Sequence, residues 1–430
     1  MAILIVIGLL MFLLIFGAPV IFAVAASGLS YFFFNPDMYE AIAIYPHRLF
    51  TGMDSYVFLC IPMFVLMGEV MNIGGMMNDL VTFCEVMVGR FKGGLAYVNI
   101  LASMIFGGIT GSGAADVTAL GPIEINLMVK GGYKRSFAAA LTACTAVQGP
   151  IIPPSIPFVI FASLTGTPVG TLFMSGVIPG ILIGISMALV VAYLSRKEGF
   201  PASTQKYSIV EIIAATKAAL VALVMPVIIL GGILTGVFTP TEASAIAAVY
   251  SLAVTKFYYK RINFNELRTV LLNTAKTTAQ IYLIVGFASV ISWELASEQV
   301  PTMISNFVKG TNMGPYTLFF LFNIFILFNG MWISDAAQLV LFAPIFTPIF
   351  ASLGVSPIHF GCVMVVNVMI SLITPPYGVC LYLASIVSGE PMSEVTKESV
   401  PFIIVSIVVL FLVTYIPAIS MTLPRLLGLV

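Results

Sequence analysis

A glycine-rich stretch from Ile109 to Ile123 holds the residue types of this chain that are best suited to binding chemistry. Gly111, Ser112, Gly113 and Asp116 lie there between segments that are almost wholly apolar. Their hydroxyl, carboxylate and backbone carbonyl oxygens are hard ligands, which a small cation such as sodium prefers over sulfur or imidazole. In lipid, backbone that leaves the helix loses hydrogen bonds at a high cost, so such a break belongs where it lines a polar cavity. The stretch therefore predicts a binding site.

The composition places this site in a membrane protein. Of the 430 residues, 60% are hydrophobic and only 8% are charged, which predicts an all-α chain that crosses a lipid bilayer many times. The 18 basic and 18 acidic residues balance, so no nucleic-acid partner is expected. Five scattered cysteines without a CxxC pair are expected to be free thiols. Two histidines without an HExxH pattern predict no histidine-based metal or catalytic centre.

The chain carries an internal repeat with an offset of 222 residues. Seven prolines lie in residues 106–179 and seven in residues 328–401, and four of them coincide at this offset, whereas chance gives roughly 0.7 coincidences. The matching pairs include Gly108 and Gly330, Ser112 and Ser334, Pro122 and Pro344, Gly132 and Gly354, Pro153 and Pro375, Pro154 and Pro376, and Pro179 and Pro401. We therefore divide the chain into a first repeat, residues 1–206, and a second repeat, residues 207–430.

The basic residues indicate how the two repeats are oriented. Basic clusters in one repeat correspond to uncharged residues in the other; these clusters are Arg90, Lys92, Lys130, Lys134 and Arg135 in the first repeat and Lys256, Lys260 and Arg261 in the second. Because Lys and Arg gather on the cytoplasmic side of a membrane, the repeats are expected to insert upside down to each other. This inverted topology leaves only three of the 18 basic residues, Arg48, Lys309 and Arg425, outside. It places the N- and C-termini on the periplasmic side.

Each repeat is expected to contain a re-entrant helical hairpin and a broken helix. The hairpins are predicted at 94–129 and 315–351, and the broken helices at 136–165 and 358–387. The prolines of residues 149–154 and 374–376 interrupt the broken helices, because proline lacks an amide hydrogen and clashes with a continuing helix. Residues 1–34 form either one bent helix or two short ones separated at Gly17 and Pro19. Two further apolar segments are expected at 277–300 and 401–423.

Two hairpin tips that face two broken helices are typical of the midplane site of a secondary transporter. Half-helix N-termini suit an anionic substrate, and freed carbonyls suit a cation. The repeat predicts two sodium sites; the first comprises Gly111, Ser112, Gly113, Asp116, Thr145, Gly149, Pro150, Ile152 and Pro153, and the second Gly330, Ser334, Asp335, Asn367, Ser371 and Thr374. The expected substrate contacts are Ser112, Asp116, Ser155, Ser334, Asp335 and Tyr377. Close helix packing by small residues is the alternative interpretation.

Several other patterns have ordinary explanations or remote functional ones. Asp116 and Asp335 fall at membrane depth, where a carboxylate is costly and therefore indicates function; capping of a returning half-helix is the alternative. An intramembrane aspartyl hydrolase that pairs these two aspartates is a remote alternative function, and no GxGD-type signature supports it. Thr239 and Glu242, with Pro240 between them, predict a capping box and a helix start.

Four motifs together resemble the large membrane subunit of tripartite ATP-independent periplasmic (TRAP) transporters. They are GITGSGAADVTALGPI at 108–123, PIIPPS at 150–155, GVFTPTEASA at 236–245 and ITPPYG at 373–378. The resemblance implies a sodium-driven importer of organic acids in the bacterial inner membrane, not an enzyme, with sodium as the coupling ion and no resident cofactor. It implies an elevator-type movement, a small membrane subunit and a soluble periplasmic binding protein as partners. The chain looks most like the sialic-acid members; C4-dicarboxylates or other carboxylates are the alternative substrates.

Overall fold

The computed structural model describes residues 2–201, 207–311 and 313–430, and within these ranges the regular structure is entirely helical. The first half contains α1 (Ala2–Ile15), α2 (Val20–Phe34), α3 (Ile44–Met53), α4 (Cys60–Gly74), α5 (Met76–Val88), α6 (Gly94–Thr110), α7 (Gly113–Ala119), α8 (Gly121–Lys130), α9 (Arg135–Thr145), α10 (Ile156–Thr165) and α11 (Val169–Glu198). Short 3-10 turns at Pro36–Ala41 and Tyr56–Leu59 flank α3.

The second half continues with a corresponding series of helices. These are α12 (Ile209–Leu234), α13 (Pro240–Ala253), α14 (Phe264–Ser297), α15 (Val300–Gly310), α16 (Pro315–Asn329), α17 (Asp335–Ser352), α18 (Pro357–Ser371), α19 (Val379–Ser388), α20 (Met392–Tyr415) and α21 (Pro417–Leu426), with a π-helical turn at Val254–Tyr258. Six helical segments of the described chain are long and apolar enough to cross a membrane.

The predicted hairpins and broken helices are present. The first hairpin consists of α6, α7 and α8 and the second of α16 and α17, while the first broken helix consists of α9 and α10 and the second of α18 and α19. The 222-residue offset reappears in their bounds: α7 and α17 begin at Gly113 and Asp335, and α9 and α18 begin at Arg135 and Pro357. The repeat boundary placed between residues 206 and 207 falls beside residues 202–206, which lie outside the described residues.

The structure decides one alternative left open by hydropathy and corrects two helix bounds predicted from it. Residues 2–34 form two helices, and Gly17, with a φ of 80°, separates them. The segment predicted at 277–300 is wrong at its start, because α14 begins at Phe264 with a capping box between Asn263 and Glu266 (2.7 and 3.0 Å). Its first turns are polar, so hydropathy does not detect them. The segment predicted at 401–423 is two helices, since Pro417 starts α21.

The predicted helix start at Thr239 is confirmed. The Thr239 hydroxyl accepts a hydrogen bond from the backbone N–H of Glu242 (3.2 Å), and the Glu242 carboxylate accepts one from the backbone N–H of Thr239 (2.8 Å). This capping box fixes the beginning of α13.

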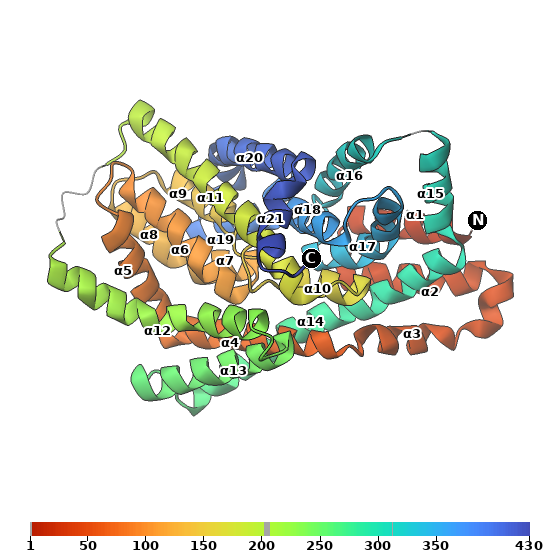
Figure 1. Ribbon diagram of the computed structural model, residues 1–430, viewed down its shortest axis with the longest axis horizontal. Helices are drawn as coiled ribbons and strands as arrows, with labels where there is room; N and C mark the ends of the chain where they lie inside the picture. Colours follow the sequence, from red (N-terminus) through yellow and green to blue (C-terminus); the bar gives the residue numbers. More distant parts are fainter. Residues whose placement is uncertain (1, 202–206, 312) are drawn as a thin grey trace.

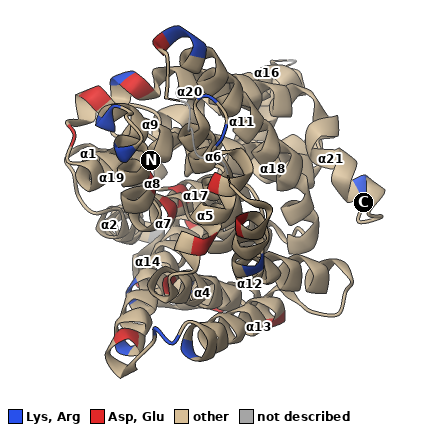
Figure 2. Ribbon diagram, turned by 90° about the vertical axis from the view of Figure 1, so that its left-hand side faces the viewer, with Lys and Arg blue, Asp and Glu red and all other residues tan. Residues whose placement is uncertain are grey.

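The helices form two layers (Figure 1). One is an elongated scaffold layer of α2, α3, α4, α12, α13 and α14, in which α14 contacts α2, α3 and α4, and α13 contacts α4 and α12. The other, the hairpin layer, contains the two hairpins and the two broken helices together with α11 and α20. Figure 2 shows Lys and Arg mainly at the periphery, whereas several Asp and Glu lie toward the centre of the view. The hairpins meet the scaffold layer where α17 contacts α14 and where α6 contacts α4.

Candidate functional site

The tip of the first hairpin rests directly on the break of the first broken helix. Gly107 of α6 packs so closely against Gly149 that a Cβ on either residue would collide with the backbone of the other. At the tip, Gly111 has a φ of 64°, and a Cβ there would lie 3.0 Å from the carbonyl oxygen of Pro154 and from the backbone nitrogen of Ile156. Positive φ and close backbone approach both require glycine. The two elements that the repeat predicted to face each other are therefore in contact.

Ser112 lies at the boundary between the two layers. It is the N-cap residue of α7, and its hydroxyl accepts a hydrogen bond from the backbone N–H of Ala115 (3.4 Å). It also lines a cavity of about 110 Å³ between the tip and the scaffold helices α4 and α14. Glu69 of α4 lines the same cavity and accepts a hydrogen bond from Asn273 of α14 (3.2 Å). The tip and the scaffold layer thus share a small polar cavity.

Asp116 lies inside the first hairpin. It is only 1% exposed, and neither of its carboxylate oxygens has a hydrogen-bond partner. Among the described residues, Asp116 is not part of the lining of the cavity beside Ser112. An unpaired buried carboxylate is costly, so Asp116 requires either a bound cation or a proton at this position.

A buried polar network beside Asp116 joins the first hairpin to α9 of the first broken helix. The side-chain amide of Asn99 donates hydrogen bonds to Glu124 (2.8 Å) and to Thr142 (2.7 Å), and its oxygen accepts one from Thr145 (2.8 Å). Ser103 donates to Thr145 (3.2 Å). The second carboxylate oxygen of Glu124 has no partner. Thr145, predicted as a sodium ligand, therefore also holds α9 to α6.

The second hairpin meets the second broken helix in the corresponding place. Gly330 lies against Ser371, the repeat equivalent of Gly149, and a Cβ on Gly330 would collide with the Ser371 side chain. Gln338 of α17 donates hydrogen bonds to the Ser371 hydroxyl (3.2 Å) and to the carbonyl of Ile333 (3.3 Å). These bonds fix the second tip to α18.

Oxygen atoms without partners gather around this second tip. The Ser334 hydroxyl, the Gln338 side-chain oxygen and the Asn367 side-chain oxygen are buried and unpartnered, although buried polar atoms as a rule have hydrogen bonds. Ser334 and Gln338 are four residues apart on α17, and Asn367 and Ser371 are four residues apart on α18, so each pair lies on one helix face. The Asn367 amide donates to Asn323 (2.9 Å), which leaves its oxygen free to face a ligand.

The other predicted residues of the first site lie in or next to the break. Pro150, Ile152 and Pro153 belong to the segment between α9 and α10. The Ser155 hydroxyl donates to the carbonyl of Pro150 and caps α10 by accepting from the backbone N–H of Phe158 (3.3 Å). A hydroxyl that already makes two hydrogen bonds is less available to a substrate.

The other predicted residues of the second site divide between the break and an outer cavity. The Thr374 hydroxyl donates to the carbonyl of Ile370 (3.0 Å). Tyr377, 47% exposed, and Ser334 line a cavity of about 670 Å³. Asp335 is half-buried at the first position of α17. Ser112 and Ser334 occupy the N-cap positions of α7 and α17. Asp116 accepts no backbone hydrogen bond and so does not cap α7, whereas the Asp335 carboxylate accepts hydrogen bonds from the backbone N–H groups of Asp335 and Ala336 and is compatible with the capping interpretation.

The chain matches, over residues 7–419, the model of the family described as "Tripartite ATP-independent periplasmic transporter, DctM component". The chain belongs to this family. The resemblance seen in the four sequence motifs is thereby confirmed. The C4-dicarboxylate TRAP transporter large permease protein DctM of Pseudomonas aeruginosa is 39% identical over 404 residues, 94% of each chain. The sialic acid TRAP transporter large permease protein SiaM of Vibrio cholerae is 35% identical over 414 residues, 96% of each chain.

The solved structures agree with these sequence relatives at the level of the fold. The Alcanivorax borkumensis YdaH transporter aligns with a TM-score of 0.63 over 92% of this chain and 90% of that chain, with 16% identity. The relatives of this TRAP permease are named as transporter proteins, not as enzymes, which removes the hydrolase alternative.

Sequence reasoning missed several polar residues of this TRAP permease. Asn99, Glu124 and Gln338 are buried within the hairpins, and the sequence patterns predict none of them as a site residue. Glu124 could have been predicted, because it is a carboxylate in a segment at membrane depth, and this is the property that indicates function for Asp116.

Proposed function

We propose that this TRAP permease imports an organic acid across the bacterial inner membrane and that sodium drives the import. The observation that carries the proposal is the pair of hairpin tips, each seated on the break of a broken helix and each surrounded by buried oxygen atoms without partners. Sodium prefers hydroxyl, amide and carboxylate oxygens. Asp116 and Ser112 at the first tip, and Ser334 and Asn367 at the second, are the side chains proposed to hold it.

The substrate is proposed to bind between the first tip and the scaffold layer, where Ser112 and Glu69 line a cavity of about 110 Å³ that has to widen to admit a sugar acid. The N-terminus of α7 faces this region and carries a partial positive charge that suits a carboxylate. Glu69 suits a hydroxyl donor and repels a second carboxylate. This arrangement supports a hydroxylated monoacid such as sialic acid over a C4-dicarboxylate, and sialic acid stays our first candidate.

The two hairpins are proposed to move together in an elevator-type cycle. Each hairpin contacts the second half of the other repeat's broken helix, since α7 packs on α19 and α17 packs on α10. These crossed contacts support a single moving body made of both hairpins and both broken helices. The scaffold layer would stay in place, together with the small membrane subunit with which large TRAP subunits work. A periplasmic binding protein would deliver the substrate on the side proposed to hold both termini.

Uptake into proteoliposomes tests this function. The purified permease with its small subunit, supplied with the binding protein loaded with sialic acid, is expected to take up substrate only with an inward sodium gradient. If two sodium ions accompany one monoanion, each cycle carries one net charge inward, worth about 2.3 kcal/mol per 100 mV, and an inside-negative potential accelerates uptake. Uptake that is independent of sodium but depends on a proton gradient would contradict sodium coupling. Uptake of a C4-dicarboxylate in place of sialic acid would contradict the proposed substrate.

A further inference from the structure

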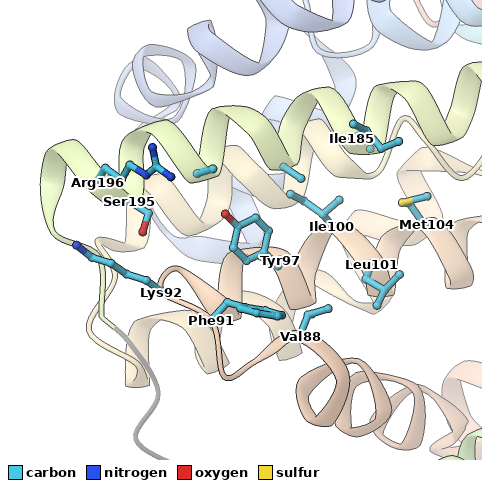
Figure 3. Close-up of a pocket in the computed structure, with 13 residues that line it drawn as sticks. Val88, Phe91, Lys92, Tyr97, Ile100, Leu101, Met104, Ile185, Ser195 and Arg196 are labelled. Atoms are coloured by element: carbon cyan, nitrogen blue, oxygen red, sulfur yellow. The ribbon is translucent and has the colours of Figure 1, made fainter.

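An apolar groove runs along the first repeat, away from both hairpin tips. It has a volume of about 570 Å³, lies between α6 and α11, and is bordered by the segment 88–92 that follows α5. Ile100, Leu101 and Met104 of α6 and Ile185 of α11 line it (Figure 3). The transport function proposed above uses none of these residues.

The groove is apolar along most of its length but cationic at one end. Lys92 and Arg196 lie together at that end with Ser195, and the Tyr97 ring lies next to them with its hydroxyl turned toward α11 (Figure 3). No Asp or Glu is among the described residues that line the groove. Two positive charges therefore border the end of the groove, with the Tyr97 hydroxyl near them, and an anionic headgroup with hydrogen-bond acceptors would fit there.

The length of the groove matches one leaflet of a bilayer. Along α11 its lining extends from Gly184 to Arg196, twelve residues or about 18 Å at the rise of an α-helix. The hydrocarbon of one leaflet is about 15 Å thick, half of a typical core. An acyl chain that starts beside Arg196 therefore ends near Gly184 and stays within the groove.

We propose that this groove binds an acidic phospholipid of the inner leaflet. Its phosphate lies at Lys92 and Arg196, and one acyl chain lies between α6 and α11. The leaflet follows from the charges, because Lys92 belongs to the basic clusters that the positive-inside rule assigns to the cytoplasm and basic pockets on that side attract anionic headgroups. The proposal is independent of the substrate and of sodium.

The position of the lipid gives it a consequence for transport. α5 packs on α12 of the scaffold layer and also on α6 of the first hairpin. Val88, at the end of α5, lines the groove together with Leu101 of α6. The lipid thus lies where the scaffold layer meets an element proposed to move, so uptake is expected to increase with the acidic lipid content of the membrane.

Lipid binding to the purified complex of permease and small subunit tests the proposal. The delipidated complex is titrated with dioleoyl phosphatidylglycerol or dioleoyl phosphatidylcholine, and bound lipid is counted by native mass spectrometry. Two variants alter the groove: the double variant Lys92→Ala/Arg196→Ala removes the charges, and Ala188→Phe fills the apolar part. Lys197→Ala and Leu189→Phe are matched controls, because these neighbours on α11 are exposed and do not line the groove.

The expected result is one phosphatidylglycerol bound in preference to phosphatidylcholine by the wild type and by both controls. The double variant should bind it roughly 30-fold more weakly, which corresponds to about 1 kcal/mol for each basic residue. Ala188→Phe should lose it. Equal binding of both lipids, or unchanged binding by the double variant, would overturn the proposal. So would a cysteine at Ala188 that cross-links to the small subunit, because a protein segment would then fill the groove. Lys92 and Arg196 are exposed, so the double variant keeps its fold even if Ala188→Phe does not.

Discussion

Replacing Ser334 with alanine affects two measurable quantities in opposite directions if the second tip binds sodium. The Ser334 hydroxyl is buried and has no hydrogen-bond partner in the protein. Without sodium, Ser334→Ala therefore removes an unsatisfied group, whose burial costs about 1 kcal/mol or more, and the variant should unfold at the same temperature as the wild type or higher. With sodium, it loses a contact to a charged ligand, worth about 2 kcal/mol, or roughly 30-fold in affinity.

The size of the sodium effect on stability follows from mass action. At a sodium concentration 100 times the dissociation constant of the second tip, the ion bound there stabilises the wild type by about 2.7 kcal/mol, and a variant with 30-fold weaker binding at this tip by about 0.9 kcal/mol. The ion at the first tip adds the same stabilisation to both proteins. Thermal unfolding of the complex in sodium chloride and in potassium chloride, at one ionic strength, measures this difference. Ser352→Ala is the control, because Ser352 ends the same helix and its hydroxyl donates to the carbonyl of Ile349 (2.8 Å); its sodium response should equal that of the wild type.

Two results would refute the reasoning. If Ser334→Ala keeps the full sodium-dependent stabilisation, the hydroxyl is not a ligand and the second site lies elsewhere. If the variant is less stable than the wild type in potassium chloride by more than about 1 kcal/mol, the hydroxyl has a protein partner of ordinary hydrogen-bond strength, and its burial without a partner is wrong.

Three further substitutions test the contacts around the tips. Gly330→Ala should reduce uptake and cost about 1–3 kcal/mol through overpacking against Ser371, and adding Ser371→Gly should recover the stability; a double variant as unstable as Gly330→Ala would place the steric clash elsewhere. Asn99→Leu should cost about 3 kcal/mol through the loss of three buried hydrogen bonds, one of them to Glu124, and lower the unfolding temperature by about 3 °C; an unchanged temperature would contradict the network. Glu69→Gln should raise the KM for sialic acid about tenfold, as a charge-assisted hydrogen bond becomes neutral, without weakening dicarboxylate uptake; equal effects on both substrates would contradict the role given to Glu69.

The backbone of the site could be predicted from the sequence because glycine and proline act locally. Gly111 and the prolines of residues 149–154 predict where a helix cannot continue, and helices of the structure end at these positions. The repeat then showed which break belongs to which tip. The start of α14 could not be predicted from hydropathy, since its first turns are polar and the capping box at Asn263 is the only local signal.

The side-chain contacts could not be predicted in the same way. Asn99 joins Glu124 and Thr142, which are 25 and 43 residues away along the chain, and no local pattern relates these positions. Asp116 was predicted to contact sodium and the substrate; it is buried inside the hairpin and does not line the cavity beside Ser112. Periodicity identifies a face, whereas the partner of that face depends on tertiary packing.

The two tips have corresponding backbone breaks but differ in charge, and this difference predicts the order in which they release their cations. At the repeat offset, the carboxylate of Asp116 corresponds to the neutral amide of Gln338, and Thr145 corresponds to Asn367. A buried carboxylate without a partner is more costly to leave uncompensated than a neutral oxygen. The first tip should therefore hold its cation more tightly, and the second tip should empty first. A sodium titration of the complex should show two phases, and Ser334→Ala should remove only the weaker one; loss of the tighter phase would mean that charge does not set the order.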